Sequence, residues 1–343
     1  MLKGNKMSRV LLDAELFSSI DLSKRTVVID ADTLLFQAAV CQQKTTYLVT
    51  HIQTGNGGWF VENKKQFKEW LLTEEAGGFS EEDYSLTPVV TLHGEISYAC
   101  HTFRQRIEEI VRNTNADDFR VCIQGSDNFR KHKEAKFVRY KANRTGDKPI
   151  LLKELADWVK VKYKDKCVVS QGEESDDSVT RFSHWFLKQA KARDQYKAVI
   201  AFVDKDIAAN HVGWSYNYNK PEDGIWWNSK KAMQYNHCMM VLTGDAADNV
   251  TGLGKLSPEI IEKYSLRSTK GVGKVSAEAI LSGAETEKER WERIIEAYKA
   301  SWPEDGMERL EEMNWFMWLR RTENEDFCLD KYLKKIGVEL DGT

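Results

Sequence analysis

Three short apolar runs of this chain each lead into acidic residues, and that repetition restricts the fold more than any other feature. The runs cover residues 26–29, 167–169 and 198–203, and the acids begin at Asp30, Glu173 and Asp204. The intervening segments place apolar residues at helical spacing, so strands are expected to alternate with helices. This alternation predicts an α/β fold with a mainly parallel central sheet and helices on both faces. Since the carboxyl ends of parallel strands share one edge, the acids are expected to lie together.

Further elements follow from the same patterns. A strand is expected at 119–123, with another at 89–92 after a loop at 76–85. Hairpins are expected to join 47–52 to 59–62, around a glycine-rich turn, and 214–218 to 225–227. Helices are expected at 33–41, 64–72, 96–113, 151–163, 174–189, 291–300 and 307–321. From residue 230 onward the chain is mostly helical in pattern, which suggests a division into domains at 1–240 and 241–343.

The composition is that of a globular protein, and no membrane-spanning segment is expected. Of 343 residues, 41% are hydrophobic and 30% are charged, and no apolar run approaches the roughly 20 residues that span a bilayer. The first residues lack the apolar core of a signal peptide. Six cysteines without a CxxC pair indicate free thiols in a reducing compartment and argue against zinc, so a cytoplasmic location is expected, that of a host cell if the chain is viral.

Acidic residues gather at four places. They are Asp30 and Asp32; Glu173, Glu174, Asp176 and Asp177; Asp204 and Asp206; and Asp245 and Asp248. Carboxylates are costly to bring together unless cations neutralise them. Convergence of these groups at one sheet edge therefore predicts a site for divalent metal ions, whose chemistry suits phosphoryl transfer.

Each acidic group also has an ordinary structural interpretation. Asp32 suits the N-cap of the helix that follows it, and acids at 173–177 suit the positive end of a helix dipole. If Asp245 and Asp248 lie on a helical turn, their spacing puts them on one face. Glu174 and Asp177 fall opposite the apolar face of their helix, so they are expected to meet ions without being buried.

A basic stretch and a glycine-rich stretch complete the pattern. Residues 130–166 contain thirteen Lys and Arg against five Asp and Glu, which suits phosphate binding, although a solvated helix face is the alternative. Residues 270–274, Lys-Gly-Val-Gly-Lys, precede a helical run whose free amides suit a phosphate. This arrangement is typical of a helix-hairpin-helix element that binds the DNA backbone without reading bases.

These motifs together resemble the 5′→3′ exonuclease and flap endonuclease family, especially its phage members. The most specific pieces are residues 242–250, Leu-Thr-Gly-Asp-Ala-Ala-Asp-Asn-Val, and the glycine hairpin that follows. Residues 174–177 and 204–206 match further acidic motifs, and residues 129–144 resemble the arch through or under which a 5′ strand passes. The resemblance covers roughly 27–281 and implies a PIN-like nuclease domain with an arch at about 129–150; residues 42–95 and those after 285 match no motif.

The resemblance implies roles for individual residues. It makes Asp30, Glu174, Asp176 and Asp177 ligands of a first metal ion or its waters, and Asp204, Asp206, Asp245 and Asp248 ligands of a second. It gives catalytic roles as cations to Lys141, Arg144 and Arg130. It assigns DNA contacts to Tyr140, Gly271, Gly273, Lys274 and Ser276. Two Mg²⁺ or Mn²⁺ ions and a K⁺ ion at the hairpin are implied as cofactors.

At one position the chain departs from the family pattern, and the identity of the metal ligand there is left open. The family usually ends its second strand with an aspartate, where this chain has Gln124, and Asp127 is the substitute after a short shift. The implied activity is hydrolysis of DNA at a free 5′ end, flap or nick, with RNA–DNA hybrids as further substrates, by a monomer that works beside replication proteins. A PIN-type ribonuclease and a non-catalytic, structure-specific DNA-binding protein are the alternatives. The sequence does not choose between exonuclease and flap endonuclease action, or among primer removal, recombination and host DNA breakdown.

Overall fold

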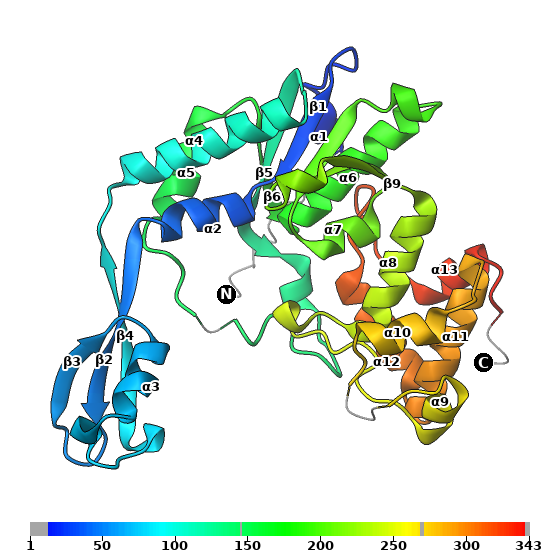
Figure 1. Ribbon diagram of the computed structural model, residues 1–343. Coiled ribbons are helices and arrows are strands. Elements are labelled where there is room, and N and C mark those ends of the chain that lie inside the picture. Colours follow the sequence, from blue (N-terminus) through cyan, green and yellow to red (C-terminus); the bar gives the residue numbers. More distant parts are fainter. Residues whose placement is uncertain (1–12, 145, 268–270, 340–343) are drawn as a thin grey trace, which may run out of the picture. The chain divides into compact units, whose positions relative to one another are not determined.

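The structure is a computed structural model that describes residues 13–144, 146–267 and 271–339 (Figure 1). The chain divides into two compact units. One comprises Met1–Asp32, Glu108–Gly146 and Tyr163–Thr343, and the other comprises Thr33–Ile107 and Asp147–Lys162. All predicted site residues that the structure describes belong to the first unit, which is therefore described in more detail.

The first unit is built on a six-stranded sheet with the order β6-β5-β1-β7-β8-β9. The strands are β1 (Thr26–Asp30), β5 (Asp118–Asn128), β6 (Cys167–Gly172), β7 (Ala198–Phe202), β8 (Gly213–Asn217) and β9 (Ile225–Asn228). Every neighbouring pair is parallel except β8 and β9. All residues of β1 and β7 are buried, as expected for central strands covered on both faces. The predicted mainly parallel sheet is confirmed.

Helix packing on this sheet is clearest for α6 (Ser175–Gln189), whose apolar face lies against the buried side chains of the central strands. This helix packs on β1, β5, β6 and β7. Its residues Val179, Phe182 and Phe186 enter a core cluster with Val28 and Ile200 of the two central strands. Each of these side chains is at most 1% exposed, so α6 is fixed against the sheet with its first turn at the acidic edge.

The N-terminal part also contains the helices α1 (Asp13–Phe17), α2 (Asp32–Val40), α4 (Ile96–Asn113), α5 (Leu152–Lys162) and α7 (Lys205–Asn210). Helix α7 was not among the expected helices, and the run 198–203 was expected to be a strand up to residue 203. Instead β7 ends at Phe202, and the side chain of Asp204 caps α7 by accepting a hydrogen bond from the backbone N–H of Asp206.

The C-terminal part is helical, as expected. Its helices are α8 (Lys230–Thr243), α9 (Pro258–Lys263), α10 (Lys274–Leu281), α11 (Glu287–Ser301), α12 (Gly306–Met317) and α13 (Leu329–Lys335). They surround Trp291 and Tyr298, both fully buried. Helix α12 ends four residues before the expected end at 321. Asn210 explains the end, because its side chain donates to the carbonyl of Met317 and accepts from the N–H of Leu319.

The second unit contains a three-stranded antiparallel sheet with the order β3-β2-β4. Besides α5 and most of α2 and α4, it contains β2 (Gln43–His51), β3 (Gly57–Val61), α3 (Lys64–Leu71) and β4 (Tyr84–Leu92). The expected hairpin is confirmed. Strand β4 begins within the segment that was expected to be a loop, because all nine residues of β2 pair with it and Tyr84 joins an aromatic cluster with Trp59 and Trp70. Within the described ranges, no helix is both long and apolar enough to cross a bilayer.

Two buried histidines of the first unit oppose folding in acid. Burial lowers the pKa of His211 to about 3 and that of His237 to about 4. At these two positions the unfolded chain binds more protons than the folded protein between about pH 6.5 and pH 4, so their contribution to stability falls as the pH drops through this window. We expect this contribution to fall by up to about 1.4 kcal/mol per pH unit for each histidine. Buried carboxyl groups with a raised pKa, such as that of Asp30, act in the opposite direction, so the test is a comparison of variants. In urea unfolding at pH 7 and pH 5, His237→Gln is expected to lose less stability, or to gain more, than wild type.

Candidate metal centre

Three aspartates converge beyond the carboxyl end of β7. Asp204 caps α7, and Asp245 caps the 3₁₀ turn η6 (Ala246–Asp248) by accepting from the N–H of Ala247 at 2.8 Å. One carboxylate oxygen from each of Asp204, Asp206 and Asp245 lies within 4.8 Å of the other two. Two capped turns thus bring together side chains that are about forty residues apart in sequence.

The loop that carries Asp245 depends on two glycines. Gly244 and Gly252 have φ angles of +73° and +62°, and their backbones cross closely. A Cβ atom on Gly244 would lie 2.3 Å from the carbonyl oxygen of Val250, and one on Gly252 would lie 2.4 Å from the nitrogen of Gly244. Asp245 and Val250 then exchange two backbone hydrogen bonds across this crossing. The glycines therefore fix where the Asp245 carboxylate points.

The chemistry of this group fits a divalent cation. The Oδ1 atom of Asp206 is buried and has no hydrogen-bond partner among the described residues. Desolvation raises the pKa of Asp206 well above its usual value, and the charges of Asp204, Asp245 and Asp248 raise it further. A buried carboxylate oxygen without a donor, beside other carboxylates, is costly unless a cation or proton occupies the site. Hard oxygen ligands are those that Mg²⁺ and Mn²⁺ prefer.

A second set of acids lies beside the first. Burial raises the pKa of Asp30, at the end of β1, to about 8, with further contributions from Asp32 and Asp204. Desolvation likewise raises the pKa of Asp176 well above its usual value, with Asp30, Asp204 and Glu174 adding to the shift. Asp204 thus repels acids from two other elements, so the two sets form one negatively charged region.

Ser175 links the acids of α2 and β1 to α6. Its hydroxyl lies 3.2 Å from Oδ1 of Asp30 and 2.9 Å from Oδ2 of Asp32. Asp32 begins α2, and its other oxygen accepts from the backbone N–H of Gln124 at 2.9 Å. Sequence reasoning assigned no role to Ser175, although its place inside the acidic run of 173–177 was a usable signal.

Cations from the basic stretch lie directly against the acids. Lys141 contacts the carboxylate of Glu174 and lies 3.4 Å from Oδ2 of Asp248, while Arg144 pairs with Oδ1 of Asp248. The hydroxyl of Tyr140 lies 2.7 Å from Glu174 and 2.9 Å from Asp248. The backbone N–H of Lys141, whose φ is +56°, donates to the carbonyl of Asp248 at 2.8 Å. Lys141, Arg144 and Tyr140 therefore lie at one site with the predicted ligands.

Arg130 and Asp177 form a buried ion pair. Two guanidinium nitrogens lie 2.6 and 2.8 Å from the two oxygens of Asp177, and neither side chain is measurably exposed. The N–H of Arg320 also donates to Asp177, and the guanidinium of Arg130 donates to the carbonyls of Phe316 and Trp318. The attraction of Arg130 lowers the pKa of Asp177, although burial opposes this.

This pair corrects one expectation. Glu174 and Asp177 were expected to lie on an exposed flank of their helix, but they are only 6% and 0% exposed. The backbone N–H of Arg320, in the segment that follows α12, donates to Asp177, and Arg130 supplies compensating charge to both acids. Both oxygens of the Asp177 carboxylate thus accept from Arg130, while its assignment as a metal ligand stays a prediction.

Breaking this pair is expected to destabilise the fold. Arg130→Met leaves the Asp177 carboxylate buried without its cation, so the free energy of unfolding should fall by about 3–5 kcal/mol. Urea unfolding measures the change. The double variant Arg130→Met/Asp177→Leu should have a free energy of unfolding closer to that of wild type, because it removes both charges. An equal loss of stability in both variants would contradict the conclusion that Arg130 compensates the buried charge of Asp177.

The second-strand position remains unassigned by geometry. The side chain of Gln124 donates to the carbonyls of Glu173 and Asp127 at 3.0 and 3.3 Å. The carboxylate of Asp127 lies 2.8 Å from Nε2 of His132, and this hydrogen bond lowers its pKa. Glu173 itself is fully buried and pairs with Arg181 at 2.8 Å. The choice between Gln124 and Asp127 as a ligand position therefore stays open.

The glycine hairpin lies between α9 and α10, with Lys270 outside the described residues. Gly271 has a φ of +74°, and Gly273 is the N-cap of α10. Lys274 is exposed and lies 3.7 Å from Glu278, while Ser276 is half-buried in the first turn. The turn suits backbone contacts, and the DNA-binding role of these residues stays a prediction.

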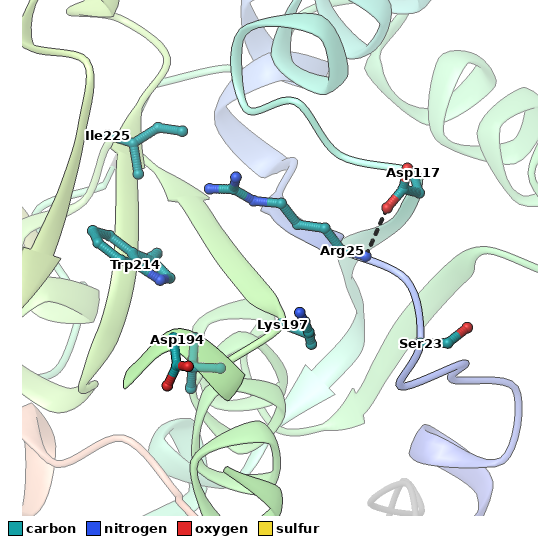
Figure 2. Close-up of a pocket in the computed structure, with 8 residues that line it drawn as sticks. Ser23, Arg25, Asp117, Asp194, Lys197, Trp214 and Ile225 are labelled. Carbon is teal, nitrogen blue, oxygen red and sulfur yellow. Dashed lines mark hydrogen bonds between the residues drawn. The ribbon is translucent and has the colours of Figure 1, made fainter. Parts of the chain in front are cut away.

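A separate cavity of about 410 Å³ lies away from the acids (Figure 2). Its wall includes Arg25, which directly precedes β1, and Lys197, which directly precedes β7. At the opposite ends of the same two strands, Asp30 is the last residue of β1 and Asp204 lies just after β7. The cavity is therefore not part of the metal centre.

Comparisons with known proteins add structural likenesses from bacteriophage T5. No protein-family model matches the chain, and no curated protein matches it in sequence. A T5 protein co-crystallised with metal ions is 13% identical, with a TM-score of 0.35 over 85% of this chain and 97% of its own. A mutant of the T5 5′-exonuclease is 12% identical, with a TM-score of 0.35 over 91% and 98%. The T5 flap endonuclease in a pseudo-enzyme-product complex with DNA and metal ions is 14% identical, with a TM-score of 0.32 over 69% and 89%. Scores this low leave the function to be inferred from the chain's own residues.

Proposed function

We propose that this protein is a divalent-metal-dependent nuclease that acts at 5′ ends of DNA, as a 5′→3′ exonuclease and flap endonuclease. The observation that carries the proposal is the convergence of Asp204, Asp206 and Asp245 within 4.8 Å, beside Asp30 and Asp176. The repulsion in such a region is relieved by bound cations or by protons, and its carboxylate oxygens are ligands that divalent cations prefer. The proposed substrates include RNA–DNA hybrids. The protein would act as a monomer, with replication proteins as its partners.

The chain's own side chains have distinct roles in this proposal. Asp30, Glu174, Asp176 and Asp177 belong to a first ion or its waters, and Asp204, Asp206, Asp245 and Asp248 belong to a second. Bound Mg²⁺ or Mn²⁺ would supply an activated water and charge compensation at the phosphate. Lys141 and Arg144 lie beside these acids, where they would add positive charge to a phosphate in the site. Arg130 supports the site through its buried pair with Asp177.

The proposal also assigns a function to each of the two parts of the chain. Residues 1–240 would form the nuclease domain with the arch at about 129–150. Residues 241–343 would bind the duplex through the glycine hairpin, with K⁺ at Gly271 and Gly273 and backbone contacts from Lys274 and Ser276. Tyr140 would face the DNA from the arch.

A substrate panel with a metal titration tests the proposal. Wild-type protein is incubated with labelled 5′-flap DNA, nicked DNA, blunt duplex and single-stranded RNA, with Mg²⁺, with Mn²⁺ and with EDTA. We expect metal-dependent cleavage of flap DNA that EDTA abolishes. Preferred cleavage of single-stranded RNA would favour a PIN-type ribonuclease, and tight flap binding without cleavage would favour a non-catalytic DNA-binding protein.

A further inference from the structure

Helix α12 holds the basic stretch through a row of side chains on one face. Glu308, Glu312 and Phe316 are spaced four residues apart, so they line up along the helix. The carboxylate of Glu308 lies 2.5 Å from the ammonium of Lys136. The ring of Phe316 stacks on Tyr140 with centroids 5.1 Å apart and an interplanar angle of 12°. The centre of the row is therefore close to the backbone that leads into the site.

At that centre, Glu312 binds three successive backbone amides. The N–H of Lys136 donates to Oε2 at 2.6 Å, and those of Phe137 and Val138 both donate to Oε1 at 2.8 Å. Glu312 is only 9% exposed, so water competes weakly for these bonds. Successive amides that point at one anion form a typical anion-binding concavity, and here a side chain of the same protein fills it. Hydrogen bonds to a charged acceptor are the stronger kind.

The anchored backbone continues directly into the metal centre. Three residues after Val138, the N–H of Lys141 donates to the carbonyl of Asp248 at 2.8 Å. Between these two attachments, Tyr140 extends its hydroxyl to Glu174. The chain from Val138 to Lys141 is therefore held at both ends, by Glu312 and by the loop of Asp248.

We infer that Glu312 is a positioning residue of the site, which fixes the backbone from which Tyr140 and Lys141 reach Glu174 and Asp248. The inference rests on the proposed function, because it assigns the position of Lys141 a role in turnover. Glu312 acts through the backbone amides and not through substrate. A merely structural role would lower the melting temperature without changing the exchange of the Lys141 amide or the turnover of folded protein.

The test compares Glu312→Ala and Glu312→Gln with Glu308→Gln in the full-length chain. Glu308→Gln is the control, because Glu308 lies on the same helix face and pairs with the side chain of Lys136, but accepts from no backbone amide of the described residues. Hydrogen exchange is measured without metal at residues 136–138 and at Lys141. Steady-state cleavage of 5′-flap DNA is measured with Mg²⁺, and only variants that melt as single folded species are compared.

We expect Glu312→Ala to speed exchange of the 136–138 amides and of the Lys141 amide by roughly tenfold to a hundredfold. We expect its kcat to fall by roughly 100-fold with KM changed less than about threefold, since small misplacements of catalytic groups cost this much. Glu312→Gln keeps only one acceptor oxygen and should lose about tenfold in kcat. Glu308→Gln should stay within about twofold of wild type in both measurements.

The outcomes separate this inference from the proposed function. Wild-type exchange at Lys141, or wild-type kcat, in folded Glu312→Ala would overturn it. If Glu312→Ala does not fold, Glu312→Gln decides by the same measurements. If wild-type protein cleaves no flap DNA, the proposed function fails, and faster exchange at Lys141 in the Glu312 variants alone decides whether Glu312 positions this segment.

Discussion

Replacing Asp204 with asparagine is expected to abolish metal-dependent cleavage of DNA while the protein stays folded. Asparagine keeps the side-chain oxygen that caps α7 through the N–H of Asp206, so the local backbone should not change. It removes one negative charge from the group with Asp206 and Asp245. Since metal ions supply several kcal/mol of charge stabilisation to such reactions, cleavage should fall by roughly a thousandfold or more. Single-turnover cleavage of 5′-flap DNA in Mg²⁺ measures this.

The same substitution should raise the melting temperature of the metal-free protein. Repulsion from Asp204 contributes to the raised pKa of Asp30, Asp176 and Asp206, so removing its charge relieves three neighbours. Asp194→Asn is the matched control, because Asp194 lines the cavity away from the metal centre. Wild-type cleavage in Asp204→Asn would refute its assignment as a ligand.

Replacing Lys141 with alanine is expected to lower kcat by roughly a hundredfold to a thousandfold. The ammonium of Lys141 lies between the carboxylates of Glu174 and Asp248, so it is held where a bound phosphate needs positive charge. At the left-handed φ of +56°, alanine and lysine have a similar conformational free-energy cost. The substitution should therefore leave the backbone conformation unchanged. Single-turnover rates with saturating enzyme separate the loss of turnover from any loss of binding.

Two controls make this prediction specific. Lys131→Ala removes an exposed cation from the same basic stretch and should change kcat less than about threefold. Lys141→Arg keeps the charge but alters its shape, and it should retain more activity than Lys141→Ala. A wild-type rate in Lys141→Ala would remove its proposed role.

The sheet and its acidic edge could be predicted from the sequence because both depend on local patterns. Apolar runs before Asp30 and Asp204 mark central strands, and parallel strands present their ends at one edge. The turn at Asp245 carries its own signal, since Gly244 and Gly252 are required by positive φ angles. Local chemistry thus fixes these parts.

The neighbours of each acid could not be predicted, because they depend on distant segments. Asp177 falls opposite the apolar face on a helical wheel, yet Arg130 pairs with it and the backbone N–H of Arg320 donates to it from the segment after α12. Glu312 has no motif around it, since its ligands are backbone amides that any sequence at 136–138 would provide. Strand β4 was underestimated because its length is set by pairing with β2.

The most direct test of the metal centre is anomalous diffraction from crystals soaked in Mn²⁺. The central claim is that acids from separate elements share bound divalent cations. We predict an anomalous peak within coordinating distance of Asp204, Asp206 and Asp245, which excess Mg²⁺ displaces. If millimolar Mn²⁺ gives no peak at these carboxylates in well-diffracting crystals, the acids do not form a metal centre and the nuclease proposal is contradicted.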